Sequence, residues 1–182
     1  GRVYGPMMSQ AELFPGVVQF MLRCKQRGDD LFIVSHKTEY GHFDPTETPL
    51  RQAALQWMDQ NGFFSKTKCG LSPERVFFET TRREKVNRIS SLNLDVFVDD
   101  LKEVFVEDEF PEIEKILFTT DNDKEQDLVS CNNWSAIANE VLGPITNEEC
   151  KELAQTVLNG RVLKVQKIQG RGNSRIYQVV TE

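Results

Sequence analysis

The chain has 182 residues, of which 39% are hydrophobic and 27% are charged, and its formal net charge is -6 at pH 7. Such a composition is typical of a globular protein, and the length suits one domain with an appendage. The acidic balance argues against general nucleic-acid binding. The sequence has no apolar run long enough for a membrane span and no signal-peptide pattern, so we predict a cytoplasmic protein.

The four cysteines are far apart in the sequence and show no paired spacing. Zinc sites and disulfide frameworks usually place cysteines in close pairs. We therefore expect reduced thiols, some of them buried, and neither a zinc site nor a disulfide framework.

The first expected elements are a helix and a short buried strand. The helix follows Phe14-Pro15-Gly16 and ends at Gly28, which is a common residue after the last turn of a helix. The strand is the apolar run Leu31–Val34, and the polar residues Ser35 and His36 stand directly after it. A long loop follows, and its length indicates a functional role.

A second helix and a second strand come next in the sequence. The helix runs from Pro49 to Asn61 with apolar residues at helical spacing, and the strand covers 75–78. The pattern Thr81-x-x-Glu84 is a capping box that opens a further helix, which carries Lys85.

The segment 96–100 is the most informative feature of the chain, because an apolar strand ends there in Asp99-Asp100. Open α/β sheets bind their ligands just beyond the carboxyl ends of buried strands. Two adjacent carboxylates repel one another, and oxygen ligands are what Mg²⁺ prefers. The alternative is a local turn in which an Asp side chain caps the next helix.

Two further elements and a boundary complete the first part of the chain. Ile116–Phe118 is an expected strand, and 134–142 is an expected helix that ends at Gly143-Pro144. The alternation of strands and helices predicts a doubly wound, mainly parallel α/β sheet in residues 1–143. Residues 144–182 are expected to form a capped helix and a β-hairpin appendage.

The order of the polar strand ends resembles motifs two, three and four of the haloacid dehalogenase-like (HAD) superfamily. The resemblance implies that Ser35 bonds a phosphoryl oxygen and that Lys85 neutralises phosphoryl and carboxylate charge. It implies Mg²⁺ ligation by the acid pair, with Asp100 favoured as the direct ligand and Asp99 supporting the metal or Lys85. His36 is a candidate phosphate-binding residue. A histidine near a phosphate could act as a donor or an acid, which applies to His42 as well, and the alternative for both is a surface position.

The first motif of that superfamily is absent from this chain. It is an Asp-x-Asp whose first Asp is the nucleophile, whereas Asp29-Asp30 precedes its strand and Asp121-Asn122-Asp123 comes too late in the order. The family's first strand lies at the centre of the sheet, so its loss would leave buried backbone groups unpaired. We expect residues upstream of Gly1 in the natural protein, or another segment, to fill that position. In the second case the domain would be an inactive relative.

The tail carries a second resemblance, covering about Val162 to Thr181. A strand, a glycine loop and a strand resemble the start of the small lobe of kinase-like phosphotransferases, including aminoglycoside and choline kinases. The possible nucleotide loop contains Gly170, Gly172, Asn173 and Ser174. The alternative is a plain turn, and ATP binding would need a complete downstream kinase domain.

Together these observations predict a Mg²⁺-dependent phosphatase or phosphotransferase domain of the HAD type, acting on a small phosphorylated metabolite within a larger HAD–kinase fusion. The second hypothesis is a catalytically inactive HAD-like regulatory or docking module attached to a small-molecule kinase. A third makes nucleotide binding at the glycine loop the main function.

Overall fold

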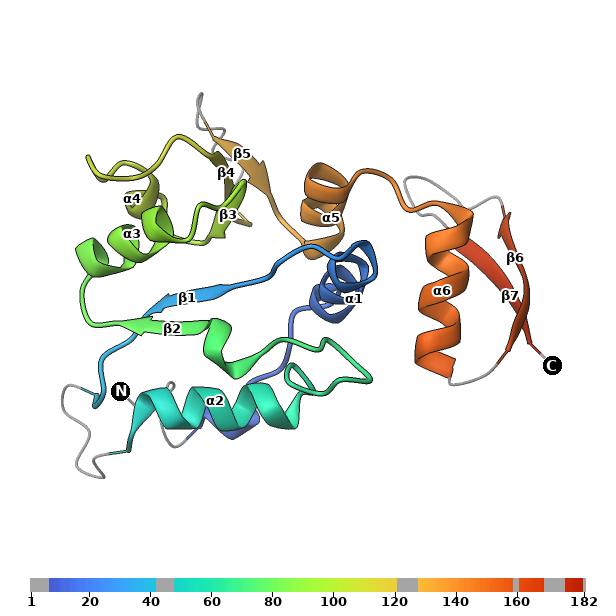
Figure 1. The fold of residues 1–182 in the computed structure, drawn as a ribbon, viewed down its shortest axis with the longest axis horizontal. Helices are drawn as coiled ribbons and strands as arrows, with labels where there is room; N and C mark the ends of the chain where they lie inside the picture. The colour runs from blue at the N-terminus through green and yellow to red at the C-terminus, as the bar shows by residue number, and fades with distance from the viewer. Residues whose placement is uncertain (1–6, 42–47, 121–127, 159–160, 169–175, 182) are drawn as a thin grey trace.

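The computed structural model describes residues 7–41, 48–120, 128–158, 161–168 and 176–181 (Figure 1). The fold is mixed α/β, with small parallel sheets and helices followed by a helix and an antiparallel hairpin. In the described part of the chain, no helix combines the length and the apolar character that crossing a membrane requires.

The first sheet contains two parallel strands joined through a helix. A short 3-10 helix η1 (Met8–Gln10) precedes α1 (Val17–Arg27), which ends as expected at Gly28, whose φ is 80°. The strand β1 (Ile33–His36) is followed by α2 (Leu50–Gln60). The 3-10 helix η2 (Pro73–Arg75) leads into β2 (Val76–Glu79), which pairs in parallel with β1.

The second sheet contains three parallel strands in the order β3-β4-β5. The helix α3 (Arg82–Ser91) connects β2 to β3 (Val96–Asp99), and the single-turn helix α4 (Lys102–Phe105) follows β3. The strands β4 (Glu114–Phe118) and β5 (Val129–Cys131) complete the sheet, and α5 (Trp134–Leu142) comes next.

Helices pack on both faces of these strands. One apolar cluster joins α1, α2 and α5 to Ile33 of β1, Val98 of β3 and Ile116 of β4. The other joins α3 and α4 to the alternate residues of the same sheets, including Val34 and Phe97. Because side chains alternate along a strand and each cluster draws on both sheets, the five strands form one layer between two groups of helices.

The strand layer is divided between β1 and β3. The amide of Lys37 donates to the Glu79 carbonyl at 2.8 Å, so the backbone groups of Val34 are directed away from β2. The amide of Glu114 donates to the Asp95 carbonyl at 3.0 Å, so the groups of Val96 are likewise directed away from β4. In the residues described, no ladder joins β1 to β3. This division lies where the HAD resemblance implies an additional central strand.

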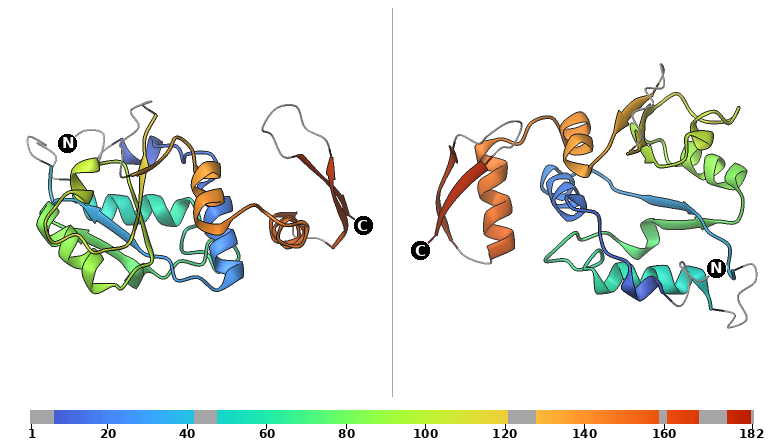
Figure 2. Two further views of the ribbon diagram at one scale, coloured as in Figure 1. Left: turned by 90° about the horizontal axis from the view of Figure 1, so that it is seen from above. Right: turned by 180° about the vertical axis from the view of Figure 1, so that it is seen from behind.

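The C-terminal elements lie at one end of the strand-and-helix body. The helix α6 (Asn147–Leu158) packs against the hairpin of β6 (Val162–Ile168) and β7 (Ile176–Thr181), which pair antiparallel. Figure 2 shows α6 and the hairpin beyond α1 and α5, away from β1 to β4. The residues 169–175 between the two strands lie outside the described residues.

Candidate functional site

The helix α3 begins with the expected capping box. The Thr81 hydroxyl accepts from the Glu84 amide at 3.1 Å, and the Glu84 carboxylate accepts from the Thr81 amide at 2.9 Å. These bonds satisfy amide donors that the first turn of a helix otherwise leaves unpaired. They fix the turn from which Lys85 projects into the protein.

Lys85 and Asp99 form a buried ion pair. The Lys85 ammonium donates to Asp99 Oδ2, and the two side chains are only 7% and 5% exposed. Burial raises the pKa of the Asp99 carboxyl and the neighbouring Asp100 adds to that rise, while the Lys85 charge opposes it. The ammonium also lies 5.6 Å from the centre of the Phe97 ring. The structure therefore brings Lys85 together with Asp99, the first acid of the pair.

Asp99 also shapes the turn that follows β3. Its Oδ1 atom accepts from the Leu101 amide at 3.0 Å, which is the local turn expected as the alternative to a metal site. Asp100 is exposed, and the described residues provide it with no ion-pair partner. The two acids therefore differ: Asp99 is engaged within the protein, and Asp100 is available to a ligand.

Ser35 and His36 lie at the end of β1, within the strand rather than after it. In the described part of the chain, the Ser35 hydroxyl has no hydrogen-bond partner, so no hydrogen bond joins it to the Lys85–Asp99 pair. The His36 Nε2 atom lies 2.8 Å from the Thr80 carbonyl, at the end of β2. A hydrogen-bond contact thus joins His36 to the loop before α3. Among the described residues, no hydrogen bond joins the Ser35 side chain to the other predicted site residues.

Arg51 is a residue of this region that the sequence patterns did not single out. From the first turn of α2 its Nε donates to the Lys37 carbonyl at 3.0 Å, and its Nη2 donates to Thr80 Oγ1 at 3.0 Å. It also lies 3.5 Å from the Glu39 carboxylate. A helix-start arginine is ordinary in a sequence, so only the tertiary structure shows that Arg51 joins the loops after β1 and β2.

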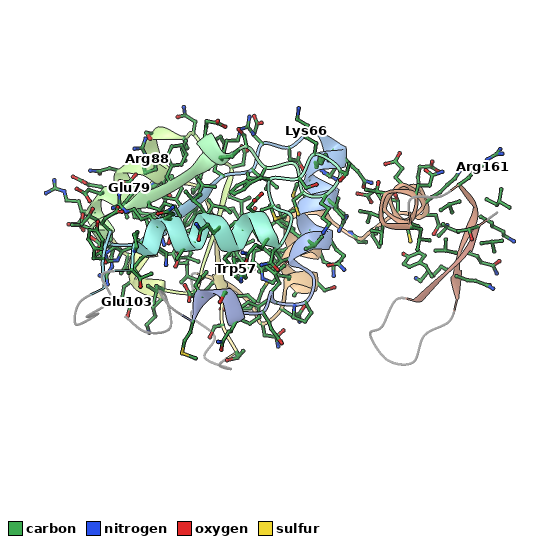
Figure 3. All side chains as sticks on the ribbon, turned by 90° about the horizontal axis from the view of Figure 1, so that it is seen from below. Trp57, Lys66, Glu79, Arg88, Glu103 and Arg161 are labelled. Carbon is green, nitrogen blue, oxygen red and sulfur yellow. The ribbon has the colours of Figure 1, made fainter. Side chains whose placement is uncertain are left out.

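Charged residues also lie at the ends of β1 and β2, where Lys37 is partly buried and Glu79 forms a second ion pair. Burial lowers the pKa of Lys37, which follows His36. The Arg88 guanidinium lies 2.8 Å from the Glu79 carboxylate, and Figure 3 shows these two residues together. At the end of β2 the Arg88 guanidinium therefore offsets the charge of the Glu79 carboxylate.

The donor set for a metal is incomplete within the described residues. They contain no group of three or more His, Cys, Asp or Glu side chains that could hold a metal ion. Asp100 offers a carboxylate of the kind Mg²⁺ prefers, whereas both Asp99 oxygens already accept hydrogen bonds. With Asp100 as the one protein carboxylate, a Mg²⁺ ion here would take its remaining oxygen ligands from phosphate, water or backbone carbonyls.

Two cavities, each about 330 Å³, lie away from the predicted site. The first is lined by Arg83, Val86 and Glu107 to Glu109. The second lies at the amino ends of β1 and β2 and is lined in part by Lys25, Cys69 and Arg75. Neither is lined by Ser35 or by Asp99.

The possible nucleotide loop, Gly170, Gly172, Asn173 and Ser174, lies outside the described residues, as does His42. The strands on both sides of the loop pair antiparallel, as a hairpin requires, with a shift of register between Val162 and Lys164. Comparisons with protein-family models, curated proteins and solved structures found no match.

Proposed function

We propose that the α/β part of this chain is a Mg²⁺-dependent phosphatase or phosphotransferase domain of the HAD type, with a doubly wound sheet, acting on a small phosphorylated metabolite. The observation that carries the proposal is the buried Lys85–Asp99 pair at the carboxyl end of β3, with Asp100 exposed beside it. Ligands bind beyond the carboxyl ends of strands in open α/β sheets.

The chain's own residues have distinct roles in this proposal. The Lys85 ammonium offsets negative charge on the phosphoryl group while it holds Asp99 in place. The Ser35 hydroxyl donates to a phosphoryl oxygen, and His36 lines the same anion site. Asp100 is the principal protein ligand of Mg²⁺, with Asp99 in support, and the bound ion would supply charge stabilisation at the phosphate.

None of the assigned residues supplies the nucleophile that this proposal needs, and an Asp on a strand paired between β1 and β3 would supply it. An Asp at the carboxyl end of that strand attacks phosphorus and releases the alcohol, and water then cleaves the aspartyl-phosphate. The same strand would pair the inner edges of both sheets, and each buried backbone group that it satisfied would be spared a cost of about 1–3 kcal/mol. Its carboxylate would also join Asp100 in the metal site.

The test is hydrolysis of p-nitrophenyl phosphate by the protein at its full natural length, with and without Mg²⁺. We expect Mg²⁺-dependent phosphate release that Asp100→Asn abolishes and that Ser35→Ala weakens less. Asp108→Asn is the matched control, because Asp108 is an exposed acid that is not part of the proposed site. Equal turnover by Asp100→Asn and Asp108→Asn would refute the proposal.

The second candidate is an inactive HAD-like module that regulates or docks a small-molecule kinase. It is favoured by the engagement of both Asp99 oxygens in internal hydrogen bonds, which serve stability without any ligand. A natural protein that releases no phosphate, and whose kinase activity changes when Lys85 is replaced, would support this candidate over the phosphatase.

The nucleotide hypothesis concerns the appendage and the kinase-like segment that would follow it. It requires ATP binding by a protein with a complete kinase domain, and we expect none by residues 1–182 alone. Equilibrium dialysis with labelled ATP compares the two proteins directly. A cytoplasmic location accords with each of these proposals.

A further inference from the structure

The helix α1 carries a buried arginine that none of the proposed functions uses. Arg23 is 4% exposed, although it belongs to a residue type that is rarely fully buried without partners. It lies where α1 packs against both α5 and α6, that is, where the body meets the appendage (Figure 2). A charge in such a place needs compensation from the elements around it.

The partners of Arg23 are on the connection to the appendage and on its first helix. The Nη2 atom donates to the Gly143 carbonyl at 3.0 Å and lies 3.3 Å from Glu149 Oε1. Gly143 has a φ of 71°, a conformation that L side chains rarely adopt. The turn at Gly143 therefore presents its carbonyl to Arg23 at the point where the chain leaves α5.

Glu149 is fixed in place by the start of α6. Its Oε2 atom accepts from the Thr146 amide at 2.9 Å, and its own amide donates to Thr146 Oγ1 at 3.1 Å. One carboxylate oxygen thus closes the capping box while the other faces Arg23. The Thr146-x-x-Glu149 pattern explains only the first of these roles, because α1 is more than a hundred residues away in sequence.

Other contacts run along the same connection. Arg27, one turn after Arg23, donates to the Leu142 carbonyl at 3.4 Å. The Tyr177 hydroxyl of β7 donates to the Ile145 carbonyl at 3.2 Å. The connection from α5 to α6 is therefore bonded to the body on one side and to the hairpin on the other.

Two buried polar atoms at this junction have no partner among the described residues. They are Arg23 Nε, a donor, and Gln26 Oε1, an acceptor. Residues three apart lie on the same side of a helix, so Arg23 and Gln26 project from the same side of α1. Burying such groups without a partner carries a desolvation cost.

We propose that Arg23 is a latch that holds the appendage on the α/β body, so that the two parts keep one fixed orientation. The latch joins α1 to the Gly143 carbonyl and to Glu149, and it opens when the Glu149 charge is lost. This inference does not depend on the proposed function. It assigns to α1 and to the start of α6 the contacts that fix the position of the hairpin relative to the body.

The test is hydrogen exchange followed by mass spectrometry on residues 1–182. Glu149→Gln removes the charge but retains a side chain that can close a capping box. Glu148→Gln is the matched control, because Glu148 is the exposed acid next to it. We expect about tenfold faster exchange in 143–158 for Glu149→Gln, as the loss of a charged hydrogen bond implies, with little change for Glu148→Gln.

Arg23→Gln removes the other member of the ion pair. We expect faster exchange in 143–158 for this variant as well, with exchange in β1 to β4 unchanged. If Glu149→Gln behaves like Glu148→Gln, the latch does not exist. If either variant raises exchange throughout the α/β body, Arg23 serves general stability rather than the junction, and the proposal is wrong.

Discussion

Replacing Lys85 with methionine removes the cation that faces Asp99 inside the protein while it leaves a side chain of similar length. Both partners are almost fully buried, at 7% and 5% side-chain exposure. Removal of one partner from a buried ion pair typically costs about 3–5 kcal/mol, against a total stability of about 5–15 kcal/mol. We therefore expect a large loss of stability from a single substitution.

The loss should also depend on pH. Burial raises the pKa of Asp99 above its usual value, and the Lys85 charge opposes that rise, so the variant's Asp99 has a still higher pKa. When Asp99 is protonated it is neutral, so the variant then buries no unpaired charge. The folded variant therefore binds a proton more tightly than the unfolded chain, and its stability falls as the pH rises. We expect a larger cost at pH 8 than at pH 5.

Urea unfolding of the wild type and the variant measures this cost. With a slope of about 2 kcal/mol per molar, a loss of about 4 kcal/mol lowers the midpoint by about 2 M. Lys66→Met is the matched control, since Lys66 is exposed on the surface (Figure 3), and its cost should stay within about 0.5 kcal/mol. A Lys85→Met cost below about 1 kcal/mol, or one equal to the control, would show that the ion pair does not stabilise the fold.

Three further predictions concern local features. Thr81→Ala removes a capping box and should lower the unfolding free energy by about 0.5–2 kcal/mol in the same urea assay. At pH 8 a disulfide reagent should label Cys150 first, because Cys24, Cys69 and Cys131 are buried and burial raises the pKa of Cys24 to about 12. Glu149 should stabilise the fold above pH 4.5 and lose that effect as the pH falls, so the difference from Glu149→Gln should shrink in acid.

The direction in which the stabilisation by Glu149 changes with pH follows from the shift of its pKa. Burial raises that pKa, but the Thr146 amide and the Arg23 charge lower it more, and the net direction is downward from 4.5. A carboxyl with a depressed folded pKa stabilises only where it is ionised. An unchanged midpoint for Thr81→Ala, equal labelling of all four thiols in the folded protein, or a constant Glu149→Gln difference would contradict the respective prediction.

The elements that could be predicted from the sequence are those with local signals. Gly28 ends α1, Thr81 and Glu84 begin α3, and Gly143 follows α5 as expected. Each signal acts through hydrogen bonds within a few residues of itself. The β5 strand was not predicted, because in Val129–Cys131 only Cys131 is buried and no apolar run marks it.

Strand registers could not be predicted, because the partner strand sets them. The expected strand Leu31–Val34 is displaced to Ile33–His36, since β1 pairs with the four residues of β2 in that register. As a result Ser35 lies within the strand. The Lys85–Asp99 contact follows from strand ends meeting at one edge of the layer, whereas the bonds of Arg51 to Lys37 and Thr80 depend on how α2 is placed.

The decisive experiment is a crystal structure of the full-length protein with Mg²⁺ and vanadate. We expect a strand paired between β1 and β3, a cation on Asp100, and a vanadate oxygen within hydrogen-bond distance of both Lys85 Nζ and Ser35 Oγ. Vanadate bound elsewhere, or an inner edge of β1 that pairs directly with β3, would contradict it.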